Sequence, residues 1–398
     1  MAAQSWRCQS SETRMSNRIK FANVIRMVFK TASIQDQAGN YAALCNLPKV
    51  TPFEWDPVRK LLTVIKPWWN LKKALVLSIH IGIGISSLFE IIFSTAIQPG
   101  IDKHELLLRI LVSNIICWSF VYHYHIWTDA EGFCALLNCI TRFNKLEIGN
   151  LDTKVMRGIL VAFKQGMILT GIAIGLLIVA CPQTPPYPTS LLQYIPTPWG
   201  WYTFIAFVVL KMIEVWNLVS WICYTALVCF CAILCNSAMY VGCKSLKKFS
   251  FKESIKKHNI LSLLSTYINV QFRKSLHFSI LIAVILLGIL SSTAAIKYHD
   301  TMPSTMMYVV AVVSVDATVT SLFIAMIPGK VNGISKDVIH GWKRQYSCGI
   351  NKFERKVIRS LREIKIQFGT ANFFEKDTCL VVVNFQILRT VDVLLLLA

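Results

Sequence analysis

The sequence predicts an all-α membrane protein with seven transmembrane helices, a cytoplasmic N-terminus and an extracellular C-terminus. Of its 398 residues, 54% are apolar and only 16% are charged, which is more apolar than a soluble domain. Seven apolar stretches are long enough to cross the roughly 30 Å of a bilayer as helices. The 41 Lys and Arg residues gather in alternate segments between these stretches.

The predicted spans differ in length, and the fourth is the longest. It contains neither glycine nor proline between Trp201 and Val241, which predicts one continuous helix. Because about 20 residues cross the bilayer, at about 1.5 Å each, this helix would extend roughly 30 Å beyond the membrane. We therefore expect long intracellular helix extensions. The seven stretches begin at Ala74, Leu106, Gly158, Trp199, His277, Met306 and Asp377.

The distribution of positive charge predicts the orientation. The N-terminal segment and three alternate loops carry 35 of the 41 Lys and Arg residues. Positive residues are retained on the cytoplasmic side, which places the N-terminus inside and, after seven spans, the C-terminus outside. The net charge of +20 is then explained by anionic lipid at the inner leaflet, and nucleic acid is not an expected partner. We expect a multi-pass protein of the plasma membrane.

The chain divides into four segments on this basis. Residues 1–73 form a cytoplasmic N-terminal segment, and residues 74–327 hold the first six spans with their intracellular extensions. Residues 328–376 are expected to form cytoplasmic anchor-like helices, and residues 377–398 the seventh span. Residues 1–50 are expected to be poorly ordered, whereas Trp and basic residues in 53–73 predict a segment along the inner leaflet.

Motifs of enzyme chemistry are scarce. His104-Glu105 lacks the second His of a zinc-protease pattern, and no phosphate-binding Gly-Lys-Ser or Gly-Lys-Thr loop occurs. His123 and His125 are two residues apart, which places them on different faces of a helix. The sequence therefore predicts no catalytic residue, no metal site and no cofactor.

Polar and aromatic residues in the outer halves of the spans are candidates for ligand binding, because each intramembrane charge costs roughly 2.5–3.5 kcal/mol. Local pairing of Lys211 with Glu214, three residues later, is the alternative explanation for those two charges. The aromatic residues could equally form a belt at the membrane interface. The candidates are Arg109, Asn114, Trp201, Tyr202, Lys211, Glu214, Tyr308 and Asp316.

The last span carries a stripe that is first polar and then apolar. Gln386, Thr390, Leu394 and Leu397 recur at intervals of three or four residues. If several subunits brought this stripe to a common axis, its apolar end would form a constriction that gates by dewetting. A buried helix with tolerated polar residues would explain the same pattern.

These features together resemble the insect gustatory and odorant receptor superfamily. The gustatory branch ends with Thr-Tyr, five apolar residues and Gln-Phe. Here Thr390 matches, but Val391, Asp392 and Leu397-Ala398 depart from that ending, so the chain resembles a divergent member. The resemblance also rests on the long fourth helix, the stretch 258–272, and the order Trp342, Lys356, Phe368-Gly369 and Phe373-Phe374 before the last span.

The resemblance implies a ligand-gated, nonselective cation channel formed by four subunits, either identical or mixed with related receptors. By this analogy the seventh helices surround the pore, and Leu394, Leu397 and Ala398 lie at the gate. A small-molecule tastant or odorant would bind within each subunit, in the outer half of spans two to six. No enzymatic activity is implied.

Two other functions stay open at this point. A solute transporter is suggested by the mid-membrane Glu90, Glu214 and Asp316, and it would require helices broken at the membrane midplane. A seven-span receptor coupled to intracellular signalling partners is suggested by the large basic cytoplasmic surface.

Overall fold

The structure is a computed structural model that describes residues 52–56, 58–59, 61–64, 103–143, 201–272, 276–345, 352–369 and 372–397, with single positions between 78 and 92 and between 158 and 172. Most of the predicted first and third spans, all of residues 1–50 and Ala398 lie outside this part of the chain. The described elements, in chain order, are β1 (Phe53–Asp56), β2 (Leu61–Val64), α4 (Lys103–Thr128), α5 (Ala130–Phe143), α7 (Trp201–Ser245), the 3-10 helix η3 (Leu246–Lys248), α8 (Phe251–Phe272), α9 (Leu276–Lys297), α10 (Ser304–Gln345), α11 (Lys352–Ser360), β3 (Gln367–Phe368), β4 (Asn372–Phe373) and α12 (Thr378–Leu397).

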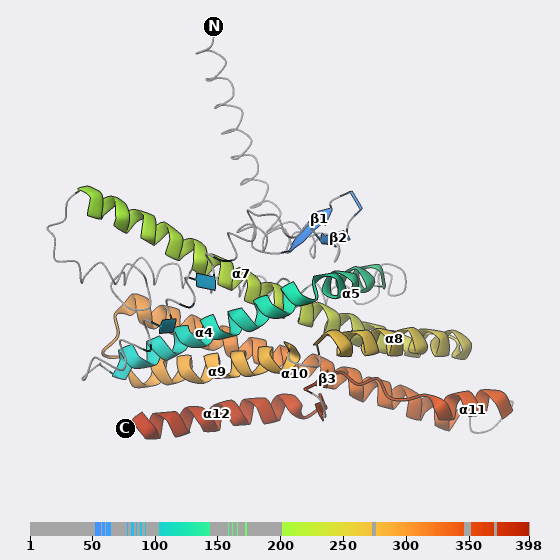
Figure 1. Ribbon diagram of the computed structural model, residues 1–398. Coiled ribbons are helices and arrows are strands. Elements are labelled where there is room, and N and C mark those ends of the chain that lie inside the picture. Colours follow the sequence, from blue (N-terminus) through green and yellow to red (C-terminus); the bar gives the residue numbers. More distant parts are fainter. Residues whose placement is uncertain are drawn as a thin grey trace, which may run out of the picture.

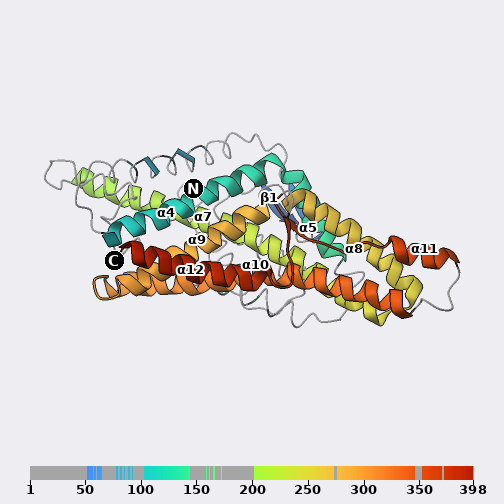
Figure 2. The same ribbon diagram turned by 90° about the horizontal axis from the view of Figure 1, so that it is seen from below.

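The long helices run alongside one another, and the shorter ones gather at one end (Figure 1). Helix α10 packs against α7, α9 and α12, and α4 packs against α7 and α9. Helices α5, α8 and α11 lie at the end that the charge distribution predicts to be cytoplasmic, whereas α12 ends at the opposite side of the bundle (Figures 1 and 2). The fold thus consists of an apolar helical bundle continued by a second, more polar one.

Two helices are much longer than a bilayer requires. Helix α7 is continuous over 45 residues, which confirms the unbroken helix predicted from its lack of glycine and proline. Helix α10 is continuous over 42 residues and contains Pro328, so the predicted domain boundary between residues 327 and 328 falls inside one helix. A proline removes one backbone donor, but the packing around α10 maintains the helix on both sides.

Within the described residues, four helical segments are long and apolar enough to cross a membrane. They are Leu227–Lys248, the whole of α9, a window in α10, and α12. The share of buried residues in the most apolar window falls from 61% in α9 to 17% in α12. Helix α12 therefore lies at the edge of the subunit with most of its surface uncovered.

The entry to α12 is positioned by close contact with α10. A Cβ atom added at Gly329 would overlap the backbone carbonyl oxygen of Glu375, just before α12. Glu375 is itself bonded to the helix start, since its backbone N–H donates to Thr378 Oγ1 at 2.8 Å. Gly329 is therefore required by the space between α10 and the chain that enters α12.

The segment beginning at Phe53 contains a hairpin that the sequence analysis did not predict. Its described residues form an antiparallel hairpin, β1 with β2, that packs on α5. Asn138 of α5 holds Leu62 by both backbone groups: its Oδ1 accepts from the Leu62 N–H at 2.8 Å, and its Nδ2 donates to the Leu62 carbonyl at 2.7 Å. Phe53 stacks on Phe133 at 5.6 Å. The hairpin is thus part of the folded core, where Phe53 is only 3% exposed.

A second asparagine holds the chain before α12 in a similar way. Asn269 of α8 donates to the Lys365 carbonyl at 2.8 Å and accepts from the Gln367 N–H at 2.9 Å. The Gln367 carbonyl also contacts Nδ1 of the buried His277 at 3.2 Å. Both asparagines supply the hydrogen bonds that a neighbouring strand would otherwise provide. They fasten irregular chain segments to the helices at the predicted cytoplasmic end.

Two glycines of α10 provide a matched test of this packing. Gly329→Ala should lower the free energy of unfolding by about 1–3 kcal/mol, because the new methyl group overlaps backbone. Gly333→Ala should raise it by about 0.5–1 kcal/mol, because nothing lies within 4 Å of its Cβ position and alanine favours a helix. Thermal unfolding of the detergent-purified protein measures both changes. Equal midpoints for the two variants would contradict the close approach.

Candidate functional site

Helix α12 has one buried face and one exposed face. Val382, Gln386 and Thr390 are buried, and they recur every fourth residue. This stripe packs against α9 and α10 of the same subunit. The predicted polar stripe therefore exists, but it is turned toward the subunit's own core.

Gln386 is the centre of this packing. Its Nε2 donates to Thr318 Oγ1 at 3.0 Å, and its Oε1 lies 3.5 Å from the donating Ser321 hydroxyl, both on α10. A Cβ atom added at Gly288 of α9 would overlap the Gln386 amide nitrogen, so this glycine makes room for the amide. The Thr390 hydroxyl donates to the Gln386 backbone carbonyl at 2.8 Å. Small residues and bonded polar side chains are the usual means by which helices approach closely in a membrane.

The predicted gate residues lie on or beside this inward-facing stripe. Gln386 and Thr390 are 5% and 8% exposed, and Leu394 and Leu397 are half-buried. None of these four residues lies on the freely exposed face of α12, and Ala398 lies outside the described residues. Helical period alone identifies a stripe but cannot say whether it faces the subunit or its neighbours. In this subunit the stripe faces inward, because the hydroxyl groups of Thr318 and Ser321 on α10 bond to the Gln386 amide.

A groove of about 330 Å³ lies beside this stripe, between α9, α10 and α12. Gln386 and Thr318 contribute polar groups to a lining that is otherwise mostly apolar. Three of the predicted gate residues border it. Its lining is Ser292, Ile296, Thr318, Val383, Gln386, Ile387, Thr390, Val391 and Leu394.

The opposite face of α12 is uncovered. Successive residues of a helix are rotated by about 100°, so positions three or four apart share a face. On the side of α12 opposite Gln386, a set of residues with this spacing has exposed side chains at every position. We call it the free stripe of α12: Val381, Asn384, Leu388, Asp392 and Leu395. Sequence analysis did not select these residues, although they recur with the same period as the buried ones.

A second apolar cluster, which we call the outer cluster, lies where α9 turns into α10, at the end of the bundle opposite the one predicted to be cytoplasmic (Figure 1). It is separate from the main core and combines residues of α4, α7, α9, α10 and the α9–α10 turn. Aromatic and Met side chains, which adapt to ligands of varied shape, are part of it. Its buried members are Leu107, Leu111, Ile116, Trp221, Ala294, Tyr298, Met302, Met306, Val309, Val310 and Val313.

Two of the predicted ligand-binding residues lie on α4 within the bundle. Arg109 is only 2% exposed. It is two residues from Leu107 and from Leu111, so it stands on the other face of α4 from these members of the outer cluster. Asn114, further along α4, donates to the Ala283 carbonyl of α9 at 3.4 Å and accepts from Trp118 Nε1 at 2.8 Å. Ala283 and Trp118 both belong to the main core, so Asn114 is bonded to the main core.

The other predicted ligand residues are dispersed. Trp201 is 73% exposed and stacks on Phe204 at 5.9 Å, and Tyr308 is 56% exposed. Asp316 is half-buried on α10, about one turn beyond Val313 of the outer cluster. The side chains of Tyr202 and Glu214 lie outside the described residues. Thus the structure buries Arg109 and half-buries Asn114 on α4 but leaves Trp201 and Tyr308 exposed at the surface.

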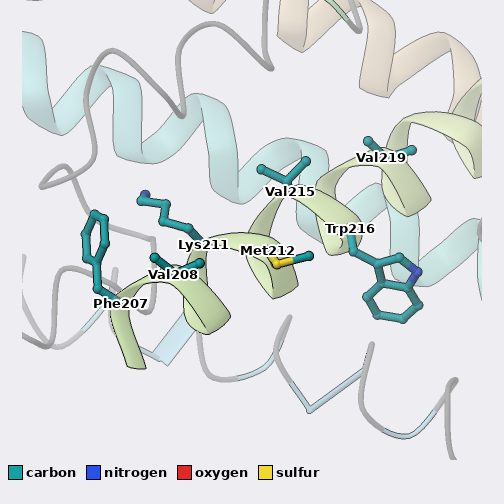
Figure 3. Close-up of a pocket in the computed structure, with 7 residues that line it drawn as sticks. All are labelled: Phe207, Val208, Lys211, Met212, Val215, Trp216 and Val219. Atoms are coloured by element: carbon teal, nitrogen blue, oxygen red, sulfur yellow. The ribbon is translucent and has the colours of Figure 1, made fainter. Parts of the chain in front are cut away.

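Lys211 borders a separate apolar groove of about 550 Å³ on α7. Figure 3 shows its lining residues projecting from successive turns of that helix, with Lys211 as the one charged side chain among them. The rest of the lining is Phe207, Val208, Met212, Val215, Trp216 and Val219. Lys211 is therefore placed on a broad apolar helix face rather than inside the outer cluster.

The chain is similar to solved protein structures, but not to curated protein sequences. No protein-family model matches the chain, and no curated protein sequence matches it. The solved structure of the insect olfactory receptor OR5 from Machilis hrabei superposes with a TM-score of 0.61 at 10% identity, covering 89% of this chain and 96% of that one. The structure of the same receptor in complex with eugenol gives a TM-score of 0.63 at 10% identity, covering 91% and 98%. The chain therefore has the fold of an insect olfactory receptor, which is the fold that the resemblance found in the sequence implies.

Proposed function

We propose that this protein is a chemosensory receptor that is itself a ligand-gated cation channel, with four subunits arranged so that the free stripe of α12 faces a common axis. The observation that carries the proposal is the contrast between the two faces of α12. The helix is apolar enough to cross a membrane, yet 17% of its most apolar window is buried and its uncovered face includes Asn384 and Asp392.

Lipid is a poor environment for that face. A charged residue in the middle of a membrane-spanning helix costs roughly 2.5–3.5 kcal/mol on insertion scales. Water in a pore, or polar groups of another subunit, removes most of that cost. The free stripe alternates polar and apolar positions, which is the composition of a pore wall that both hydrates ions and closes by dewetting.

The ligand site in this proposal is the outer cluster, and Arg109 and Asn114 on the neighbouring helix α4 are candidates for polar contacts. The eugenol complex of the Machilis hrabei receptor supports a small organic molecule as the kind of ligand. Asp316, Lys211 and Glu214 remain candidates for further polar contacts, and the ligand is a tastant or an odorant. The receptor would act in the plasma membrane, as a homomer or together with related subunits.

Helix α10 supplies a route from the ligand to the pore. It carries Val313 of the outer cluster and, one to two turns further on, Thr318 and Ser321, which hold Gln386 of α12. A ligand that displaces α10 would therefore move α12 through these hydrogen bonds. The transporter alternative gains no support here, because α7, α9 and α12 are unbroken helices.

The stoichiometry of the detergent-purified protein is the first test of the proposal. Native mass measurement or particle images should give a fourfold assembly with α12 at its axis. Exclusive recovery of a stable monomer would contradict the homomeric channel. Co-expression with a related receptor subunit then distinguishes a mixed assembly from a protein that does not form a channel.

Two polar residues of α12 distinguish its faces. Gln386→Ala should lower the free energy of unfolding by about 1–3 kcal/mol, because Thr318 and Ser321 lose their partner inside the bundle. It should leave the conductance of the surviving channels unchanged. Asn384→Ala should change conductance with little loss of stability, because its side chain is exposed in the subunit. If instead Gln386→Ala changed the conductance and Asn384→Ala lowered the stability, the Gln386 stripe would be the face that lines the pore.

Two leucines near the outer end of α12 test the gate. Leu395, on the free stripe, is 71% exposed, whereas Leu397, two residues later, is half-buried on the opposite side of the helix. Leu395→Ala should raise ligand-free current several-fold, because a smaller side chain lets water enter an apolar constriction. Leu397→Ala is the control and should leave that current unchanged. Patch-clamp recording at matched surface expression decides, and equal currents from the two variants would contradict the assignment.

A further inference from the structure

One side of helix α8 is left uncovered by the described part of the chain. The other side is buried and includes Ser254, His258, Leu261 and Ile268. At about 100° per residue, six exposed residues fall within about 40° of one line along the opposite side. We call this line the outer face of α8: Lys252, Lys256, Asn259, Leu263, Thr266 and Val270.

The outer face changes from basic to apolar along the helix. Helix α8 ends four residues before α9, a candidate membrane span, begins, so the two lysines stand at the end of α8 that is farther from that span. Leu263 and Val270 stand nearer to α9 and are 72% and 64% exposed. Helix α8 itself is not apolar enough to cross a membrane. Its outer face is therefore an amphipathic strip beyond the described spans, at the end predicted to be cytoplasmic (Figure 1).

Anionic lipid does not account for these lysines. Lys252 precedes Val270 by 18 residues, which is about 27 Å along the helix. The field of an anionic leaflet decays over about 8 Å at physiological ionic strength. If lipid were the partner, the lysines would stand near α9 and the apolar residues far from it, and the observed order is the reverse. Attraction to the inner leaflet therefore does not explain the positive charge at the start of α8.

The chain itself offers no counter-charge for this face. Glu253 of α8 is already paired with Lys257, at 3.7 Å. Neither Lys252 nor Lys256 forms an ion pair with another described residue. Residues 1–50 contain more Lys and Arg than Asp and Glu. A second copy of the chain would bring the same surplus of positive charge to the contact, so charge complementarity favours a different molecule.

We propose that the outer face of α8 is a docking surface for an acidic amphipathic helix of a separate cytoplasmic protein. Carboxylates at one end of that helix pair with Lys252 and Lys256, and aliphatic side chains at its other end cover Leu263 and Val270. A single phosphate group cannot occupy a strip about 27 Å long. Nucleic acid fits less well, because the strip has no aromatic side chain on which bases stack. The inference concerns an interaction and does not rest on the proposed channel function.

Binding of designed peptides to the detergent-purified protein tests the proposal. The probes are two fluorescent helical peptides of about 20 residues, with glutamates at one end of one face and leucines at the other, in the two possible directions. Fluorescence anisotropy should show saturable binding of one of them. Lys252→Glu combined with Lys256→Glu should weaken that binding about tenfold, because both charge pairs become repulsive. Leu263→Asn should weaken it several-fold. Absence of saturable binding, or full binding to the double variant, would overturn the proposal.

Helix α11 provides the matched control for charge alone. Lys352 and Lys356 are exposed and four residues apart, like the two lysines of α8. Lys352→Glu combined with Lys356→Glu therefore makes the same change of charge on another helix and should leave peptide binding as in the wild type. An equal loss of binding would assign the effect to overall charge and overturn the docking surface. Since all four lysines are exposed, both double variants should keep the thermal midpoint of the wild type.

Other occupants of the face give different results in two further measurements. Leu263→Cys with a short bis-maleimide should form no more cross-links between copies than the wild-type cysteines do, and a clear excess would assign the face to a second copy and overturn the proposal. In nanodiscs at fixed salt, peptide affinity should be the same with neutral lipid as with phosphatidylserine. Loss of binding in phosphatidylserine would show that the leaflet already holds the lysines, which would also overturn it.

Discussion

The structure depends on one buried amide. Lipid offers no hydrogen bonds, so a primary amide inside a membrane bundle must bond to protein groups. Gln386 reaches Thr318 at 3.0 Å because Gly288 leaves space for it on the facing helix. This contact joins α9, α10 and α12 at one point. It also decides which face of α12 packs within the subunit, and hence which face is left uncovered.

Long helices connect that local contact to both ends of the molecule. At about 1.5 Å per residue, the 45 residues of α7 and the 42 residues of α10 each extend over roughly 60 Å, about twice the thickness of the hydrocarbon core. Helix α10 therefore reaches the outer cluster, the partners of Gln386, and the Gly329 contact that places the start of α12. This single helix connects the proposed ligand site to both ends of the proposed pore helix.

Sequence patterns predicted the features that are local and missed those that need a partner. The continuity of α7 follows from the absence of glycine and proline, and the apolar length of α12 follows from composition. The orientation of α12 could not be predicted, because Val382 and Val381 begin two stripes with the same period. The partners that distinguish them, Thr318 and Ser321, lie more than 60 residues away in the chain. The hairpin that contains Phe53 was missed for the same reason, since Asn138 holds it through the backbone of Leu62.

The sorting of polar groups on α12 follows from what each costs in lipid. Gln386 and Thr390 are neutral, and they are buried where α10 or the helix backbone bonds to them. Arg389 and Asp392 are charged, which costs more, yet they are the groups left exposed. In a helix surrounded by lipid, the opposite arrangement would be more stable. The exposed ion pair is therefore the feature of α12 that is least compatible with contact with lipid on all sides.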